Sequence, residues 1–277
     1  MIANKTVQGA VQGAKPWVER LSRLGYATKG MVYVIVGSLA FQAALGTGGE
    51  TTDSRGVLET IFRQHWGRVQ LLLIAVGLFG YMVWRLTEAI FDIEDKGRDA
   101  RGLLKRAGYA LSGLAYGSLA LTALQLVLGL TTSGSGDSSQ VWTGRLLALP
   151  VVGRWLVAAV GAAAAAIGVN AAYVAVTGMF LKKIRTEQMS EDGQRWTRVA
   201  GIIGLCARGI VLGIVGYFFL SAAWTYNASR AGDSAQAMSF VERFPGGSWL
   251  LAVLAVGVVV YGLYALLVQS RYREMNL

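Results

Sequence analysis

The chain has 277 residues, of which 54% are hydrophobic and 15% charged, and its formal net charge is +10. Soluble domains usually carry about 25% charged residues, so this composition is typical of a membrane protein. A single cysteine and a single histidine exclude an internal disulfide framework, a Cys/His zinc site and a bis-histidine haem. We therefore expect no metal and no cofactor.

The first predicted element precedes the apolar segments. It contains no apolar core followed by a small-residue cleavage site, so we expect no cleaved signal peptide. Residues 1–15 are predicted to form a polar tail, and a helix is predicted to begin at Pro16, because proline is tolerated in a first helical turn. Trp17, Leu21 and Leu24 would share one face of that helix. This pattern predicts a lead-in helix at the membrane interface.

Six apolar segments follow, each long enough to cross a hydrocarbon core about 30 Å thick. They lie at residues 28–46, 69–91, 107–130, 151–180, 199–226 and 248–269. The sequence therefore predicts an all-α polytopic membrane protein with six transmembrane helices, in a single transmembrane domain over residues 1–277.

Basic residues are distributed unevenly between the two sides of this topology. The N-terminal segment, the second and fourth loops and the C-terminal tail carry most of the 26 lysines and arginines. Basic residues favour the cytoplasmic side, so both termini are predicted to be cytoplasmic. The basic loops would then face anionic headgroups of the inner leaflet, which explains the net charge without a nucleic-acid partner.

One entry phrase occurs three times, each time at the start of an apolar run: GYATKG at 25–30, GYALSG at 108–113 and GLCARG at 204–209. Each copy continues through an apolar helix, a turn with Asp-Ser, a short amphipathic stretch and a second apolar helix. Asp or Ser at these turns is expected to cap a short helix on the outer side. The predicted caps are Asp53, Ser54, Asp137, Ser138, Asp233 and Ser234.

This pattern resembles a bacterial integral membrane family described as domain of unknown function 1206, in which a two-helix unit is repeated three times. The resemblance rests on the glycine entries, the Asp-Ser turns and the Gly-Arg helix starts, and it covers nearly the whole chain. It implies three repeats, at about 16–92, 99–180 and 194–272, and a membrane location, but no activity. Copy two departs from the pattern, because the aromatic end formed by Tyr81 and Trp84 in copy one has no clear match there.

Glycines recur on one face of the first helix of each copy. Small residues let membrane helices approach closely, so these glycines predict packing faces and a pseudo-threefold bundle. A ligand that approaches bare backbone is the alternative interpretation. The glycines are Gly30, Gly37, Gly113, Gly117, Gly209, Gly213 and Gly216.

A polar position also recurs toward the outer end of each first helix, as Gln42, Gln125 and Ser221. Uncharged polar residues in a bilayer need hydrogen-bond partners or water. Two interpretations remain open: hydrogen bonds between helices, or a polar ring that lines an outward-facing cavity on the threefold axis.

Charged residues within the spans gather toward the inner side. Arg85 and Glu88 are three residues apart and can pair along one helix face. Lys29 and Arg208 occupy the same repeat position on their first helices. Snorkelling and structural pairing are one interpretation; a charged inner gate, or a site for an anionic lipid or solute, is the other.

The sequence supports two functional hypotheses. The first is a pore or carrier for a small solute or ion, with its path along the pseudo-threefold axis. The second is a non-catalytic accessory or scaffolding subunit that binds another membrane protein or lipid. We do not expect an enzyme, because no nucleophile or phosphate-binding motif is present and Glu88 is the one acidic residue well inside a span.

Overall fold

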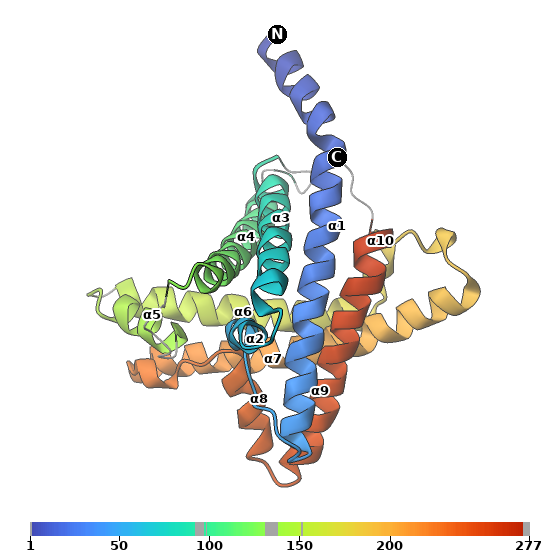
Figure 1. Ribbon diagram of the computed structural model, residues 1–277. Coiled ribbons are helices and arrows are strands. Elements are labelled where there is room, and N and C mark those ends of the chain that lie inside the picture. Colours follow the sequence, from blue (N-terminus) through green and yellow to red (C-terminus); the bar gives the residue numbers. More distant parts are fainter. Residues whose placement is uncertain (1, 92–96, 98, 131–137, 151, 274–277) are drawn as a thin grey trace.

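Six long helices and several short ones make up the computed structural model, which describes residues 2–91, 97, 99–130, 138–150 and 152–273 (Figure 1). The long helices are α1 (Ile2–Ala44), α3 (Gly67–Phe91), α4 (Ala100–Val127), α6 (Val152–Val176), α7 (Glu191–Thr225) and α9 (Gly247–Leu263). The short ones are α2 (Ser54–Phe62), α5 (Ser138–Leu147) and α8 (Ser234–Glu242), with 3₁₀ turns η1 (Met179–Lys183), η2 (Thr186–Gln188) and η3 (Ala228–Arg230). A π-helical turn, η4 (Tyr264–Gln269), and α10 (Ser270–Tyr272) extend α9.

Each long helix provides an apolar stretch of 23 to 35 residues, enough to cross a membrane; for α9 this stretch includes η4 and α10 and runs from Gly247 to Tyr272. The six stretches coincide with the six segments predicted from the sequence, apart from shifts at their ends. The chain is therefore a multi-pass membrane protein. We call the end where α2, α5 and the cap of α8 meet the short-helix end, and the end where α10 lies beside α1 the terminal end (Figure 1).

The beginning of α1 differs from the prediction. The helix does not begin at Pro16 but runs without interruption from Ile2 to Ala44, so the segment at 2–15 predicted as a tail is helical. A proline inside a helix removes one backbone hydrogen bond and crowds the preceding turn. The structure accommodates that cost within a helix of 43 residues.

The Asp-Ser turns begin the short helices, and the aspartate is the cap. The Oδ1 atom of Asp53 accepts hydrogen bonds from the backbone N–H groups of Arg55 and Gly56, and Asp233 does the same at the start of α8. Ser54 and Ser234 are the first helical residues and not the caps. In copy two, α5 begins at Ser138, whereas Asp137 and the Ser138 side chain lie outside the described part.

Long-range packing follows the order of the repeats. The second helix of each copy lies along the first helix of the next: α3 along α4, α6 along α7, and α9 along α1. Within a copy, α1 packs on α3 and α7 packs on α9. Among the described residues, α4 and α6 form no comparable contact, so copy two is an open hairpin.

The predicted glycines lie in these contacts between copies. A Cβ atom at Gly30 would lie 2.5 Å from the backbone nitrogen of Leu266, and one at Gly216 would lie 2.7 Å from that of Ala165. Gly113 and Gly117 face Leu86 and Met82 of α3. Gly37 faces Val259, and Gly209 faces Gly168. A Cβ atom at Gly213 would meet nothing within 4 Å, but a Cβ atom at Gly168 would lie 2.9 Å from the backbone nitrogen of Gly213.

The structure does not confirm a pseudo-threefold bundle. Gly25 packs against Tyr81 and Gly204 packs against Tyr261 of the same copy. A Cβ atom built at either glycine would lie 2.6 Å from the nearest atom of that tyrosine, whereas a Cβ atom at Gly108 would meet nothing within 4 Å. Copy two lacks the tyrosine that closes the other two hairpins. Figure 1 shows α6 and α7 running across α1, α3 and α9 instead of alongside them.

An apolar core separates the two ends of the molecule. Its buried members come from both ends of the sequence and include Val36 of α1, Leu78 of α3, Val211 of α7, Met238 of α8 and Val258 of α9. This core fills the middle of the contact between α1, α3 and α9. Polar groups described below lie on either side of it.

The glycine contact between α1 and α9 can be tested with one added methyl group. Gly30→Ala would overpack the backbone of α9, so we expect a loss of about 1–3 kcal/mol and a lower melting temperature. Gly108→Ala is the matched control, because its Cβ has open space and alanine favours a helix. Equal melting temperatures for the two variants in the same detergent would contradict the close contact.

Candidate functional site

Lys29 is the centre of a polar cluster in the terminal half of the molecule. Its side chain does not snorkel to the surface, since the residue is only 3% exposed. Its Nζ atom lies 6.0 Å from the ring centroid of Tyr33, 5.2 Å from Tyr81, 5.6 Å from Tyr116 and 5.5 Å from Tyr261. Four helices supply these rings, so the ammonium group lies where α1, α3, α4 and α9 meet.

The repeat explains why these side chains meet. Most members of the cluster occupy equivalent positions in two copies, 83 residues apart between copies one and two and 179 or 180 apart between copies one and three. The equivalent pairs are Lys29 and Arg208, Tyr33 and Tyr116, and Tyr81 and Tyr261.

Arg85 extends the cluster along α3. Its Nε atom donates a hydrogen bond of 2.9 Å to the Tyr81 hydroxyl, which also accepts one of 3.4 Å from Lys29 Nζ. The Arg85 guanidinium lies over the ring of Tyr109 at 5.2 Å. Because the Tyr81 oxygen accepts from two cations, its own hydrogen remains available to a further acceptor.

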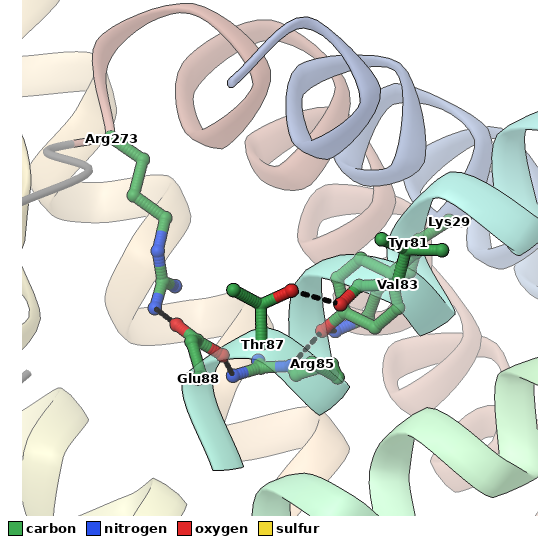
Figure 2. Close-up of polar contacts among 7 residues, drawn as sticks. All are labelled: Lys29, Tyr81, Val83, Arg85, Thr87, Glu88 and Arg273. Carbon is green, nitrogen blue, oxygen red and sulfur yellow. Dashed lines mark hydrogen bonds and ion pairs between the residues drawn. The ribbon is translucent and has the colours of Figure 1, made fainter. Parts of the chain in front are cut away.

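Glu88 joins this cluster to the C-terminal segment (Figure 2). Its carboxylate lies 2.5 Å from Arg85 Nη1 and 3.7 Å from Arg273 Nη2, and its side chain is fully buried. The Arg273 guanidinium also lies 4.9 Å from the ring centroid of Tyr26. A backbone hydrogen bond of 2.8 Å from Arg185 to the carbonyl oxygen of Tyr272 holds this segment beside the fourth loop.

The charges of the cluster do not balance. Glu88 pairs with Arg85 and Arg273, but among the described residues no carboxylate lies within ion-pair distance of Lys29 or Arg208. Arg208 lies over the ring of Tyr261 at 5.3 Å, and its buried Nε–H has no hydrogen-bond partner in the part of the chain that the structure describes. A buried charge without a counter-ion costs several kcal/mol, and each cation–π contact returns about 0.5–2 kcal/mol.

Other buried polar atoms near the cluster also lack partners in the described part. They are the hydroxyl oxygens of Ser22 and Tyr26, the indole nitrogen of Trp84, and Gln269 Oε1 at the end of the π-helical turn. Lys29 and Arg208 carry only hydrogen-bond donors, and each tyrosine hydroxyl can donate as well as accept. The arrangement is therefore rich in donors and suited to an anion.

The sequence predicted a charged cluster of Lys29, Arg85, Glu88 and Arg208. In the structure, Lys29 and Arg85 both donate to Tyr81, Arg85 pairs with Glu88, and Lys29 and Arg208 both lie near the ring of Tyr261. The spacing of Arg85 and Glu88 predicted their pairing, and the ion pair is present. The tyrosines and Arg273 were missed. Repeat register could have identified the four tyrosines around Lys29, because they form two pairs of equivalent positions. No such signal marked Arg273.

The polar positions near the short-helix end are less concentrated. Gln42 is exposed, Gln125 is half-buried, and the Ser221 hydroxyl accepts a hydrogen bond of 3.4 Å from Arg230. A cavity of about 350 Å³ lies at this end, but none of the three residues is among those that line it. The structure does not show them as a ring around one cavity.

No metal site is present among the described residues, since no three His, Cys, Asp or Glu side chains lie close enough to hold an ion. The chemistry that the cluster offers is thus hydrogen bonding and charge.

The ion pair on α3 can be tested with the residues of copy three, which has Ala265 and Val268 in place of Arg85 and Glu88. Glu88→Val would leave Arg85 and Arg273 without this carboxylate, so we expect a loss of about 3–5 kcal/mol. The double variant Arg85→Ala/Glu88→Val should lose clearly less. Thermal unfolding in one detergent of the wild type, of the single variants Arg85→Ala and Glu88→Val and of the double variant gives the coupling; strict additivity would argue against the pair.

Comparison with known proteins gives the family but no activity. The family model described as Domain of Unknown Function (DUF1206) matches three times, at residues 24–92, 107–178 and 203–273. A protein of Bacillus subtilis (strain 168), described as Uncharacterized protein YxxB, is 35% identical over 265 residues, which is 96% of this chain and 94% of that protein. No solved structure matches. Three matches over the three repeats, with a relative similar along almost its full length, show that the chain belongs to the DUF1206 family.

Proposed function

We propose that this protein is a carrier for a small anion, which binds between Lys29 and Arg208. The observation that carries the proposal is that Lys29 and the Nε atom of Arg208 are buried, while neither residue has a carboxylate partner in the described part of the chain. Both contact the ring of Tyr261, at 5.5 Å and 5.3 Å, so one ligand can reach both. The Tyr81 hydroxyl would donate a third hydrogen bond. The proposal involves no covalent step.

Charge supports an anion over a cation or a neutral solute. A bound anion would neutralise the excess positive charge and satisfy the Arg208 Nε–H, and both changes lower the cost of burial. Ionisable residues inside a membrane domain commonly mark ligand or ion pathways. A phosphate or carboxylate group would fit the donors, whether it belongs to a free solute or to a lipid headgroup. We favour the free solute, because the site lies in the interior, among four helices.

Transport requires the helices to move. The apolar core separates the site from the short-helix end, so the site is closed on that side. Lys29 is on α1 and Arg208 is on α7, and α7 is paired with α6 and crosses the other long helices (Figure 1). Because α4 and α6 make no comparable contact among the described residues, the pair of α6 and α7 is held to the other long helices mainly through α7 and α9. Its movement would open the site and change the separation of the two cations.

The scaffolding alternative receives less support. A face for another membrane protein would be expected at the small-residue segment GAAAAAIG, residues 161–168 of α6. In the structure, Gly161 and Gly168 of this segment pack on the backbone of α7, near Leu220 and Gly213. The glycine side of α6 is therefore occupied within the chain.

We also propose that the protein resides in the bacterial inner membrane with both termini in the cytoplasm. The support is the excess of lysine and arginine in the terminal segments and in the second and fourth loops. In this orientation the anion site lies in the cytoplasmic half. The basic loops would contact anionic lipid headgroups.

The anion proposal can be tested by flux into liposomes of zwitterionic lipid. We expect uptake of at least one anion from a panel of chloride, nitrate, phosphate, acetate and succinate. Lys29→Gln should lower that uptake about tenfold or more, because it removes a charge-assisted contact. Lys105→Gln is the matched control, since Lys105 is an exposed lysine of α4, and its flux should stay at the wild-type level.

Two results would overturn the proposal. One is the absence of flux for the whole panel in protein that remains folded. The other is equal flux for Lys29→Gln and Lys105→Gln. Saturable binding of phosphatidylglycerol in nanodiscs without any flux would assign the site to a lipid headgroup instead.

The orientation can be tested with single cysteines in a Cys206→Ala background. Cysteine at Asp53 or at Asp233 should react with a membrane-impermeant maleimide in intact spheroplasts, because both lie at the short-helix end. Cysteine at Lys105 should react only after the cells are broken. If the cysteines at positions 53 and 233 reacted from opposite sides of the membrane, copies one and three could not have the same orientation.

A further inference from the structure

The cavity at the short-helix end lies on the other side of the apolar core from the cluster around Lys29. We call it the short-helix pocket. Its volume is about 350 Å³, within the range of about 300–1,000 Å³ that is typical of small-molecule sites. All three copies contribute to it, through α2, α5, α6, α7 and the cap of α8. Its lining includes Asp53, Ser139, Trp142, Thr143, Phe219 and Asp233.

Most of the pocket wall is apolar. Leu146, Val157 and Val160 line one part of it, with the rings of Trp142 and Phe219 nearby. Aromatic faces attract cations, and aliphatic walls favour a ligand with an apolar portion.

Two carboxylates lie at the polar side of the pocket. Asp53 uses its Oδ1 atom to cap α2, through hydrogen bonds of 3.0 Å and 2.9 Å from backbone N–H groups. Its other oxygen has no partner among the described residues. Asp233 also lines the pocket, as does Arg55. Two carboxylates and one guanidinium leave a net charge of −1.

Two hydroxyl groups complete the polar side. Thr143 is 1% exposed, and within the described residues neither its Oγ1 atom nor the buried Oγ atom of Ser139 has a hydrogen-bond partner. A buried hydroxyl without a partner is unfavourable, because it has lost its hydrogen bonds to water. Each oxygen can accept a hydrogen bond, and so can the second oxygen of Asp53.

From this combination we infer that the pocket binds a small organic cation, an ammonium group attached to a short apolar or aromatic portion. The ammonium would donate to Asp53 and Thr143, and the apolar portion would lie against Trp142 and Val160. This site is separate from the anion site by position and has the opposite charge. It goes beyond the proposed carriage of an anion and does not depend on it.

The probe for this inference is 2-phenylethylammonium, titrated calorimetrically into full-length protein in nanodiscs of zwitterionic lipid. Empty nanodiscs give the background, and 2-phenylethanol and 3-phenylpropanoate are the neutral and anionic comparisons. We expect saturable binding of about one ammonium ion per protein, and binding of the alcohol and the carboxylate at least about tenfold weaker.

Asp53→Asn should weaken binding of the ammonium about tenfold. Asparagine caps a helix about as well as aspartate does, so α2 should remain intact and the charge alone is removed. Thr143→Val, which keeps the shape and removes the hydroxyl, should also weaken it. Asp99→Asn is the matched control, because Asp99 caps α4 by accepting a hydrogen bond of 3.0 Å from Gly102 and does not line the pocket.

Equal binding of the ammonium and the alcohol would overturn the inference, as would unchanged affinity in both Asp53→Asn and Thr143→Val. Absence of binding above the empty nanodiscs would do the same. Lys29→Gln should lower anion flux and leave the affinity for the ammonium ion unchanged. The binding measurement therefore tests the pocket separately from the anion carrier.

Discussion

The burial of Lys29 without a carboxylate is the constraint on which the terminal half of the structure depends. An ammonium group at this depth must be stabilised by other polar or polarisable groups. Four tyrosine rings within 6.0 Å provide part of that stabilisation, and they come from α1, α3, α4 and α9. Those helices can supply the rings only if they converge on one point. The cation thus couples the positions of all three copies, since α4 belongs to copy two and α9 to copy three.

Repetition accounts for both the packing and the chemistry of this protein. Glycines at equivalent positions let each first helix approach the second helix of another copy, and tyrosines at equivalent positions surround the cation. Divergence between copies then supplies the charges. Copy two has Ser112 where Lys29 and Arg208 stand in the others, and Arg85 and Glu88 have no charged counterpart in copy three. A repeated framework therefore carries an asymmetric electrostatic centre.

The sequence predicts the elements of this fold better than their arrangement. Apolar length predicts the six spans, and small residues on one helix face predict Gly30 and Gly216 as contact points, because these properties are local. The partner of each face is not local. Arg273, near the C-terminus, pairs with Glu88 across 185 positions of sequence, and no periodicity marks it. Pro16 was misread for the opposite reason: a local rule for helix starts does not apply where the rest of a long helix continues through the proline.

Copy two determines how such a molecule could move. Tyr81 and Tyr261 each close the hairpin of their own copy against Gly25 and Gly204, and copy two has neither that ring nor that contact at Gly108. The open hairpin divides the long helices into α1, α3, α4 and α9 on one side and α6 with α7 on the other. Packing of α7 on α9 and its π-helical extension joins the two groups, and π-helical turns are frequent at functional sites. Displacement at this joint would shift Arg208 relative to Lys29, and a bound anion between them would favour the closed position by bridging two like charges.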